Sequence, residues 1–208
     1  MPDDRMMPND ALRLLFLAIE DVMGGDGMKA VLHGSKLDRY INNYPAKNLE
    51  LGVKFSEYGG AEQAVEDFYG PRGAKAMLLR VGRATFNYGI KEQSAVLGLA
   101  GQALKAMPLP TGAKMKLLLE QLAVAANKSI NQPTRLEEDA DGFSFIVDHC
   151  ICLYRPKHSA PCCHVTVGAL TEAMKWLTDK HFDVKEVECM NLGAAVCKYR
   201  IPKTPSEQ

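Results

Sequence analysis

The sequence has no excess of charge of either sign and no long uncharged apolar run. Its 208 residues carry 25 Lys and Arg against 25 Asp and Glu, so the formal net charge is zero. Proteins that bind nucleic acid or anionic membranes through their overall charge have a basic surplus. The most apolar stretch, residues 11–23, is interrupted by Arg13, Glu20 and Asp21 and is too short to span a bilayer. We therefore expect neither nucleic acid binding nor membrane insertion.

Two targeting and cofactor signatures are also missing. The first ten residues hold acids and two prolines instead of the basic and apolar regions of a signal peptide, so we expect a cytoplasmic protein. The glycine-rich segment 24–27 lacks the spacing and the preceding strand of a dinucleotide-binding motif. In a reducing compartment, the six cysteines are expected to be free, metal-bound or redox-active and not paired.

The hydrophobic pattern changes character along the chain. Apolar residues recur at helical spacing through residues 1–133, with a break at residues 24–27 and a helix end at Gly70, where Pro71 begins the next helix. Residues 134–202 predict two strands around an Asp-Gly turn, a helix over 162–181, and two final strands around residues 191–194. The sequence thus predicts one α+β domain, in which N-terminal helices pack on a small antiparallel β-β-α-β-β unit, followed by a tail at 203–208.

Two cysteines near the end of the chain, Cys189 and Cys197, are equidistant from Gly193. In a hairpin centred on that glycine they face each other, with Cβ atoms about 5 Å apart. That separation suits two thiolates on one ion and also permits a strained disulfide. Small core residues are a third interpretation, because buried cysteines often serve only as packing.

Two further residues favour the metal. Glu186 lies three residues before Cys189, so both side chains can reach one point only if the strand bulges between them. Cys163 begins the predicted helix, where free backbone N–H groups favour a thiolate. Cys163, Glu186, Cys189 and Cys197 then offer three sulfurs and one oxygen, a set that suits tetrahedral zinc.

The order Cys-x22-Glu-x2-Cys-x7-Cys resembles the 4-vinyl-reductase domain family, which also supplies the sensor modules of bacterial phenol-responsive activators. Cys163 stands five residues before Gly168, as in that family. A Val-x-Glu-x-x-Cys strand follows at Val184 to Cys189, and a Gly-x-x-x-Cys strand follows at Gly193 to Cys197. The resemblance is specific over about residues 134–202 and looser over residues 70–89.

The resemblance implies a fold of the nitric-oxide-signalling and Golgi-transport ligand-binding superfamily, generally dimeric. In the related sensors, the matching three cysteines and glutamate hold a structural zinc beside a buried cavity for small apolar or aromatic molecules. This sequence departs from the pattern at Cys150, Cys152, Cys162 and His164, which could supply a different ligand or a second site. For Cys150 and Cys152, small residues on one packed strand are the favoured interpretation, and His164 is expected to serve only through hydrogen bonds.

We therefore expect a homodimeric, non-catalytic small-molecule sensor with structural Zn²⁺, because a closed four-ligand site leaves no position for a reactive water. An enzyme or auxiliary carrier in tetrapyrrole vinyl reduction is the alternative, and a trafficking-type scaffold is a third hypothesis. Residues on the predicted helices and strands are expected to line the ligand cavity: Met77, Arg80, Val81, Phe86, Phe143, Phe145, Leu170 and Met174.

Overall fold

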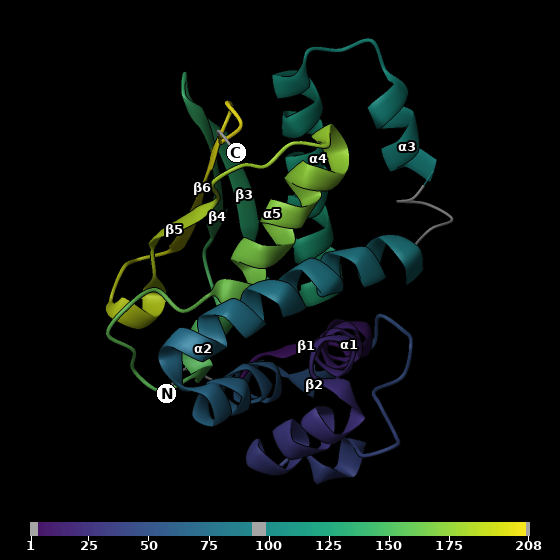
Figure 1. The fold of residues 1–208 in the computed structure, drawn as a ribbon, viewed down its shortest axis with the longest axis vertical. Helices are drawn as coiled ribbons and strands as arrows, with labels where there is room; N and C mark the ends of the chain where they lie inside the picture. The colour runs from purple at the N-terminus through teal and green to yellow at the C-terminus, as the bar shows by residue number, and fades with distance from the viewer. Residues whose placement is uncertain (1–3, 93–98, 207–208) are drawn as a thin grey trace.

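A computed structural model describes residues 4–92 and 99–206 of the chain, and it shows a helical layer beside a small sheet (Figure 1). The helices are α1 (Asn9–Gly34), α2 (Phe55–Glu92), α3 (Leu99–Ala106), α4 (Thr111–Ala125) and α5 (His164–Thr178). The strands are β1 (Met6–Pro8), β2 (Leu51–Lys54), β3 (Thr134–Glu138), β4 (Gly142–Val147), β5 (Lys185–Glu188) and β6 (Cys197–Pro202). The predicted α+β class is confirmed. Among the described helices, none is both long and apolar enough to cross a membrane.

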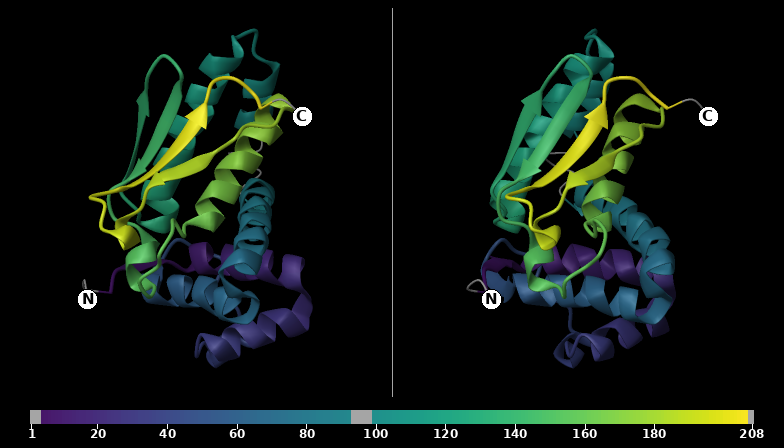
Figure 2. Two further views of the ribbon diagram at one scale, coloured as in Figure 1. Left: turned by 60° about the vertical axis from the view of Figure 1, so that its left-hand side comes forward. Right: turned by 90° about the vertical axis from the view of Figure 1, so that its left-hand side faces the viewer.

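The main sheet is antiparallel, with the strand order β3-β4-β6-β5. The β-β-α-β-β order predicted for the last third of the chain is therefore correct. Helices α4 and α5 lie against the same face of this sheet (Figure 2). A second sheet, the ribbon of β1 and β2, was not predicted, because its two short strands are 42 residues apart and show no alternation of apolar and polar residues.

Glycines bend the two longest helices. Gly24 has φ 76° and Gly70 has φ 66°, values that L residues rarely adopt, so each helix changes direction there without a loop. The break predicted at residues 24–27 is thus a kink, after which α1 resumes and buries Val31 and Leu32. The helix end predicted at Gly70, with Pro71 starting the next segment, is confirmed. The start predicted at Ser94 for the following helix lies outside the described residues.

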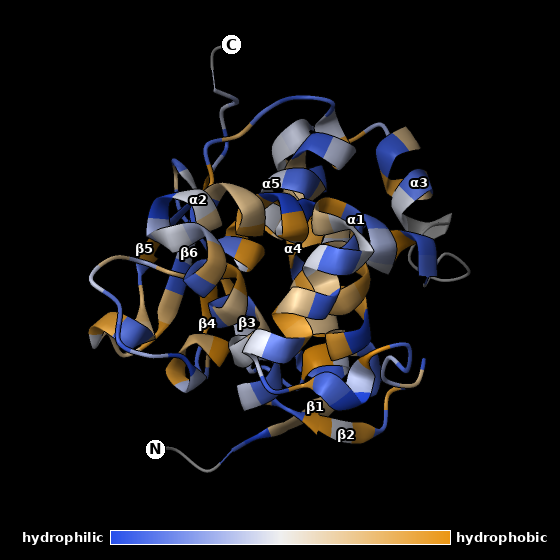
Figure 3. Ribbon diagram, turned by 60° about the horizontal axis from the view of Figure 1, so that its bottom comes forward, coloured by the Kyte–Doolittle hydropathy of each residue, from blue (hydrophilic) through white to orange (hydrophobic). Residues whose placement is uncertain are grey.

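Two hydrophobic clusters form the interior. One joins α1 to α2, and the other lies between the main sheet and helices α4 and α5. Apolar residues accordingly gather on the facing sides of these elements (Figure 3). Helix α2 contributes to both clusters, through Leu78 and Val81 to the first and through Phe86 to the second. It therefore connects the N-terminal helices to the sheet.

Helices α2 and α5 approach each other closely enough that their backbones touch. A Cβ atom on Gly82 would overlap the carbonyl group of Val165, and one on Gly168 would overlap the carbonyl group of Leu79. Only glycine fits at these two positions, because the overlapping atoms belong to backbone and cannot rotate away. The crossing fixes the position of α5, and with it the position of Cys163 at the α5 N-terminus.

We predict that Gly82→Ala destabilises the protein by about 1–3 kcal/mol, because the added methyl group forces α2 and α5 apart. Gly89→Ala on the same helix is the matched control, since a Cβ there meets no atom within 4 Å. The control should be neutral or slightly stabilising. Urea unfolding followed by circular dichroism measures both, and equal stability of the two variants would contradict this view of the crossing.

Candidate metal centre

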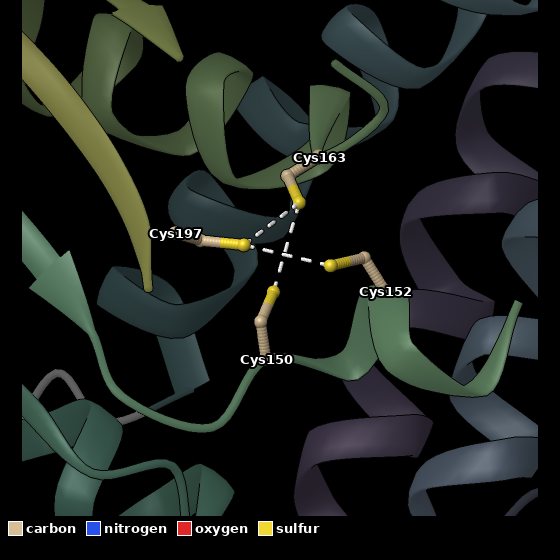
Figure 4. Close-up of side chains that lie close together, drawn as sticks. All are labelled: Cys150, Cys152, Cys163 and Cys197. Atoms are coloured by element: carbon tan, nitrogen blue, oxygen red, sulfur yellow. Dashed lines mark hydrogen bonds between the residues drawn. The ribbon is translucent and has the colours of Figure 1, made fainter. Parts of the chain in front are cut away.

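All six cysteines are buried and unpaired, and the groups they form meet at one point beside the N-terminus of α5. Four of them are drawn in Figure 4, with their sulfur atoms directed at one another. The Sγ atoms of Cys150 and Cys163 are 3.6 Å apart, those of Cys152 and Cys197 are 3.5 Å apart, and those of Cys163 and Cys197 are 3.9 Å apart. A disulfide requires about 2.05 Å, so the disulfide interpretation of these contacts is excluded.

The predicted ligand set comes together in this region. One ligand atom from each of Cys163, Glu186, Cys189 and Cys197 lies within 4.8 Å of all the others. The bulge expected in the strand is present, because the pairing of β5 with β6 shifts register between Glu186 and Glu188. Beyond the bulge Glu188 pairs with Lys198, a register centred on Gly193 as predicted. Cys189 follows directly after β5 and is thereby brought to Cys197 at the start of β6.

The connection between β5 and β6 is more elaborate than a tight turn. It contains the short 3₁₀ helix Met190–Leu192, and Gly193 then adopts φ 100°. Within it, the backbone N–H of Met190 donates a hydrogen bond of 3.3 Å to the Sγ atom of Cys197. An N–H group directed at a sulfur favours the thiolate form, since hydrogen bonds to a charged acceptor stabilise the charge.

Glu186 has one satisfied oxygen and one orphan. Its Oε2 accepts a hydrogen bond of 2.9 Å from the backbone N–H of Cys163. Its Oε1 is buried without a hydrogen-bond partner among the described residues. Burial, together with the neighbouring Cys189, raises the pKa of Glu186 to about 8. A buried acceptor without a partner costs about 1–3 kcal/mol, and a metal ion at this position would satisfy it.

Cys150 and Cys152 do not lie on one strand face, so the strand placement expected for them is wrong. Strand β4 ends at Val147, and the chain then turns into the 3₁₀ helix Ile151–Tyr154. Leaving the sheet frees both side chains from strand alternation and directs them to the same point as Cys163 and Cys197. Cys162, next to Cys163, joins a further group with Cys152, Cys163 and Cys189, whose sulfurs also lie within 4.8 Å of one another.

The two cysteine-bearing loops are tied together by Asn191, which is 2% exposed. Its Nδ2 donates to the carbonyl oxygens of Cys152 and Pro156, at 2.8 and 2.9 Å. Its Oδ1 accepts a hydrogen bond of 2.8 Å from the backbone N–H of His158. No motif in the sequence indicated this role, because a single asparagine in a turn has many ordinary uses.

A buried arginine also adjoins the cluster. The side chain of Arg155 is fully buried, and its Nη1 donates a hydrogen bond of 2.9 Å to the carbonyl oxygen of Cys162. It forms an ion pair of 2.7 Å with Glu66 and a longer one of 3.6 Å with Glu62, both on α2. Burial raises the pKa of Glu62 to about 7, against the opposing charge of Arg155. Arg155 thus shares its charge between α2 and the cysteine loop.

The side chains expected to line a ligand cavity are distributed over both clusters and the surface. Phe86, Phe143, Phe145, Leu170 and Met174 are packed together between the sheet and helices α4 and α5. Val81 is buried in the cluster of α1 and α2, and Met77 packs against that cluster. Arg80 is exposed and borders a shallow depression with Arg83. That these residues bind a ligand stays a prediction.

A groove of about 1080 Å³ opens directly beside the cysteine cluster, between α2, α5, β5 and the loop 156–162. Cys162 and Glu186 lie at its inner end. Its apolar lining is Leu79, Val167, Phe182, Val184 and Val187, and its basic lining is Arg72, Lys75, Arg83, Lys157 and Lys185. His164 also faces it, and burial together with the charges of Lys75 and Arg155 lowers the pKa of His164 to about 4. The groove therefore combines apolar walls with positive charge.

The raised pKa of Glu62 predicts a pH-dependent stability. A carboxyl whose pKa rises from 4.5 to about 7 on folding contributes stability that is present below pH 4.5 and lost as the pH rises through 7. Relative to Glu62→Gln, the wild-type free energy of unfolding should fall by up to about 3 kcal/mol between pH 4.5 and pH 8. Both proteins share the cysteine cluster, so the difference between their urea unfolding curves isolates Glu62. A difference that does not change with pH would refute the assignment, and the exposed Glu120→Gln serves as control.

Comparison with known proteins adds two findings. The family model of the 4-vinyl-reductase domain matches residues 143–203, which include the predicted motif from Cys163 to Cys197. No curated protein matches the chain. Solved structures of H-NOX proteins are similar over nearly the whole chain at low sequence identity.

Three of them give the extent of the similarity. The Fe(II) unliganded H-NOX protein from K. algicida superposes with a TM-score of 0.61 and 13% identity, covering 97% of this chain and 98% of that one. An oxygen-binding H-NOX domain related to soluble guanylate cyclases gives a TM-score of 0.56 and 14% identity, with coverage of 97% and 98%. A structure from a study of heme distortion in the H-NOX family gives 0.58 and 12%, with the same coverage. The segment 143–203 is thus a 4-vinyl-reductase domain, as its motif predicted, within a chain that has the fold of the H-NOX proteins.

Proposed function

We propose that this protein is a non-catalytic sensor module that binds a small molecule and is held in shape by a structural zinc ion. The single observation that carries the zinc assignment is the approach of Cys163, Glu186, Cys189 and Cys197 to within 4.8 Å, with the orphan Oε1 of Glu186 among them. Three thiolates and one carboxylate are a zinc donor set. The Sγ separation of 3.9 Å between Cys163 and Cys197 is close to the edge of about 3.8 Å expected for a tetrahedron with Zn–S bonds of about 2.3 Å.

The zinc would act as a mechanical link. Its ligands come from the N-terminus of α5, from β5 and the residue after it, and from the first residue of β6. All four positions of the ion would be filled by protein, so no water is bound and activated there. The ion would instead join α5 to the edge of the sheet where irregular backbone provides few ladder hydrogen bonds.

The ligand that the groove suits has an apolar or aromatic body and an anionic group. The apolar side chains of α2, α5 and the segment 182–187 would contact the body, and the basic side chains would pair with the anion. Arg83 and Lys75 are exposed and lie on the α2 wall, so their charges are free to turn toward a ligand. The eight residues predicted for a buried cavity belong to α2, α5 and the strand β4 behind this wall, and they would be reached only by a ligand that enters between the helices.

Haem, named in connection with the H-NOX family, does not fit the residues present. It requires a wide, enclosed apolar slot with an axial ligand, most often histidine. Both hydrophobic clusters are filled by the chain's own side chains. His33 and His181 are exposed, and His158 is bound to Glu66 and to the carbonyl of Pro156. His149 contacts Tyr154 and Phe55, and His164 faces the charged groove. We derive no function through haem.

We also propose that the module works as a cytoplasmic homodimer. Among the described residues, Phe68 and Tyr69 are large hydrophobic side chains next to the kink of α2, and they are 55% and 47% exposed. Adjacent exposed aromatic residues are typical of an interface. A second copy would also give a bound ligand a route to a downstream partner, since signal transfer requires a contact outside this domain.

The zinc assignment predicts that Cys189→Ser loses the metal and much of its stability, because apparent zinc binding energies reach about 10 kcal/mol. Inductively coupled plasma mass spectrometry of purified protein measures the zinc, and thermal unfolding measures the stability. Glu186→Gln should show a weaker affinity for zinc in a chelator competition. A wild-type protein without zinc, together with an unchanged melting temperature for Cys189→Ser, would sink the assignment.

The ligand assignment is tested with 8-anilinonaphthalene-1-sulfonate, an aromatic anion that fluoresces in apolar surroundings. We expect saturable binding, weakened about tenfold by Arg83→Ala or Lys75→Ala, since a hydrogen bond to a charged group contributes about 1.5 kcal/mol. Lys29→Ala on α1 is the matched control, an exposed lysine that does not line the groove. Equal affinities of all four proteins would place the ligand elsewhere.

A further inference from the structure

We propose that the cysteine cluster holds two zinc ions, the second bound by Cys150, Cys152, Cys163 and Cys197. This site adjoins the one formed by Cys163, Glu186, Cys189 and Cys197, and the inference rests on the function proposed above. Both ions would share the sulfur atoms of Cys163 and Cys197 as bridging thiolates. Each ion would then have four protein ligands.

The geometry of the second site is the geometry of one tetrahedral ion. The four sulfur atoms lie within 4.8 Å of one another. Three of their separations are 3.5, 3.6 and 3.9 Å, against about 3.8 Å for the edge of a zinc–thiolate tetrahedron. In Figure 4 the sulfurs of Cys150, Cys152, Cys163 and Cys197 point inward from four sides. An iron–sulfur cluster places inorganic sulfide between its thiolates and needs more room than this.

The two sites overlap in the way that a binuclear centre requires. Their ligand groups have two members in common, Cys163 and Cys197. The Sγ atoms of these residues are 3.9 Å apart, so both can contact two ions placed on either side of the line between them. Five cysteines and Glu186 together provide enough donors for two four-coordinate ions only if two sulfurs are shared. The sharing therefore follows from both the count of donors and their positions.

The charges around the cluster suit such a centre. Two Zn²⁺ ions with five thiolates and one carboxylate leave about two negative charges uncompensated. The fully buried guanidinium of Arg155 lies one hydrogen bond from the carbonyl oxygen of Cys162 and supplies positive charge beside them. The first turn of α5 begins at Cys163, and the N–H of Met190 reaches Cys197, so both bridging sulfurs also face backbone dipoles.

Cys162 discriminates this arrangement from another. A group of Cys152, Cys162, Cys163 and Cys189 also lies within 4.8 Å, and it would make Cys163 and Cys189 the bridges. The short separations between Cys150 and Cys163 and between Cys152 and Cys197 favour the first arrangement. In it Cys162 binds no metal, so Cys162→Ser is a matched control: a buried cysteine in the same cluster whose loss should leave both ions.

The experiment counts zinc per chain by native mass spectrometry, on full-length protein purified under anaerobic conditions with zinc. We expect two ions in the wild-type protein, two in Cys162→Ser, and one in Cys150→Ser. The wild-type protein is then reconstituted with Co²⁺ and titrated. Two thiolate-bridged Co²⁺ ions couple magnetically, so the high-spin electron paramagnetic resonance signal should rise to one equivalent and fall as the second ion binds.

Each outcome decides. One zinc in the wild-type protein, absent from Cys189→Ser, would overturn the second site and leave the proposed function standing. No zinc, or visible absorption from an iron–sulfur cluster, would overturn both. Loss of an ion from Cys162→Ser, or two ions retained by Cys150→Ser, would overturn the ligand set. If Cys150→Ser does not fold, the cobalt titration of the wild-type protein decides: a signal that rises linearly to two equivalents would exclude a bridged pair.

Discussion

The contact between the backbones of α2 and α5 at Gly82 and Gly168 determines where everything else in the C-terminal half can lie. Cys163 precedes Gly168 by five residues, so the crossing places the N-terminus of α5 relative to α2 within a fraction of a side chain. The same helix α2 carries Glu62 and Glu66, which reach Arg155 in the cysteine loop. One close approach therefore positions a cysteine, an anionic pair and a wall of the groove together.

The metal centre occupies the part of the fold where regular hydrogen bonding ends. Strand β4 stops at Val147, β5 bulges and stops at Glu188, and β6 begins at Cys197. Loops between these ends would have few fixed contacts of their own, and the side chain of Asn191 replaces some of them. Metal–sulfur bonds are strong enough to organise such a region. The placement of the cysteines at strand ends is thus the physical counterpart of the irregular backbone that surrounds them.

Much of this could be predicted because local patterns agreed with the tertiary structure. The spacing of Glu186 and Cys189 required a bulge, and the symmetry of Cys189 and Cys197 about Gly193 gave the register. The fates of Cys150 and Cys152 could not be read in this way, because alternation continues in the sequence past the point where the chain leaves the sheet. Arg155 was not foreseen either, since its burial depends on carboxylates about ninety residues earlier in the chain. The pairing of β1 with β2 is likewise a long-range contact without a local signal.

The inner end of the groove consists of Cys162 and Glu186, so the surface that a ligand would touch is continuous with the shell of the metal centre. Binding free energies at two such adjacent sites are linked, and the linkage is reciprocal. Any ligand that prefers the metal-loaded arrangement of Glu186 tightens the hold on the ion by the same factor by which the ion tightens the hold on the ligand. The occupancy of the groove would then depend on the supply of metal as well as on the concentration of the ligand, and the module would act as a coincidence detector for the two.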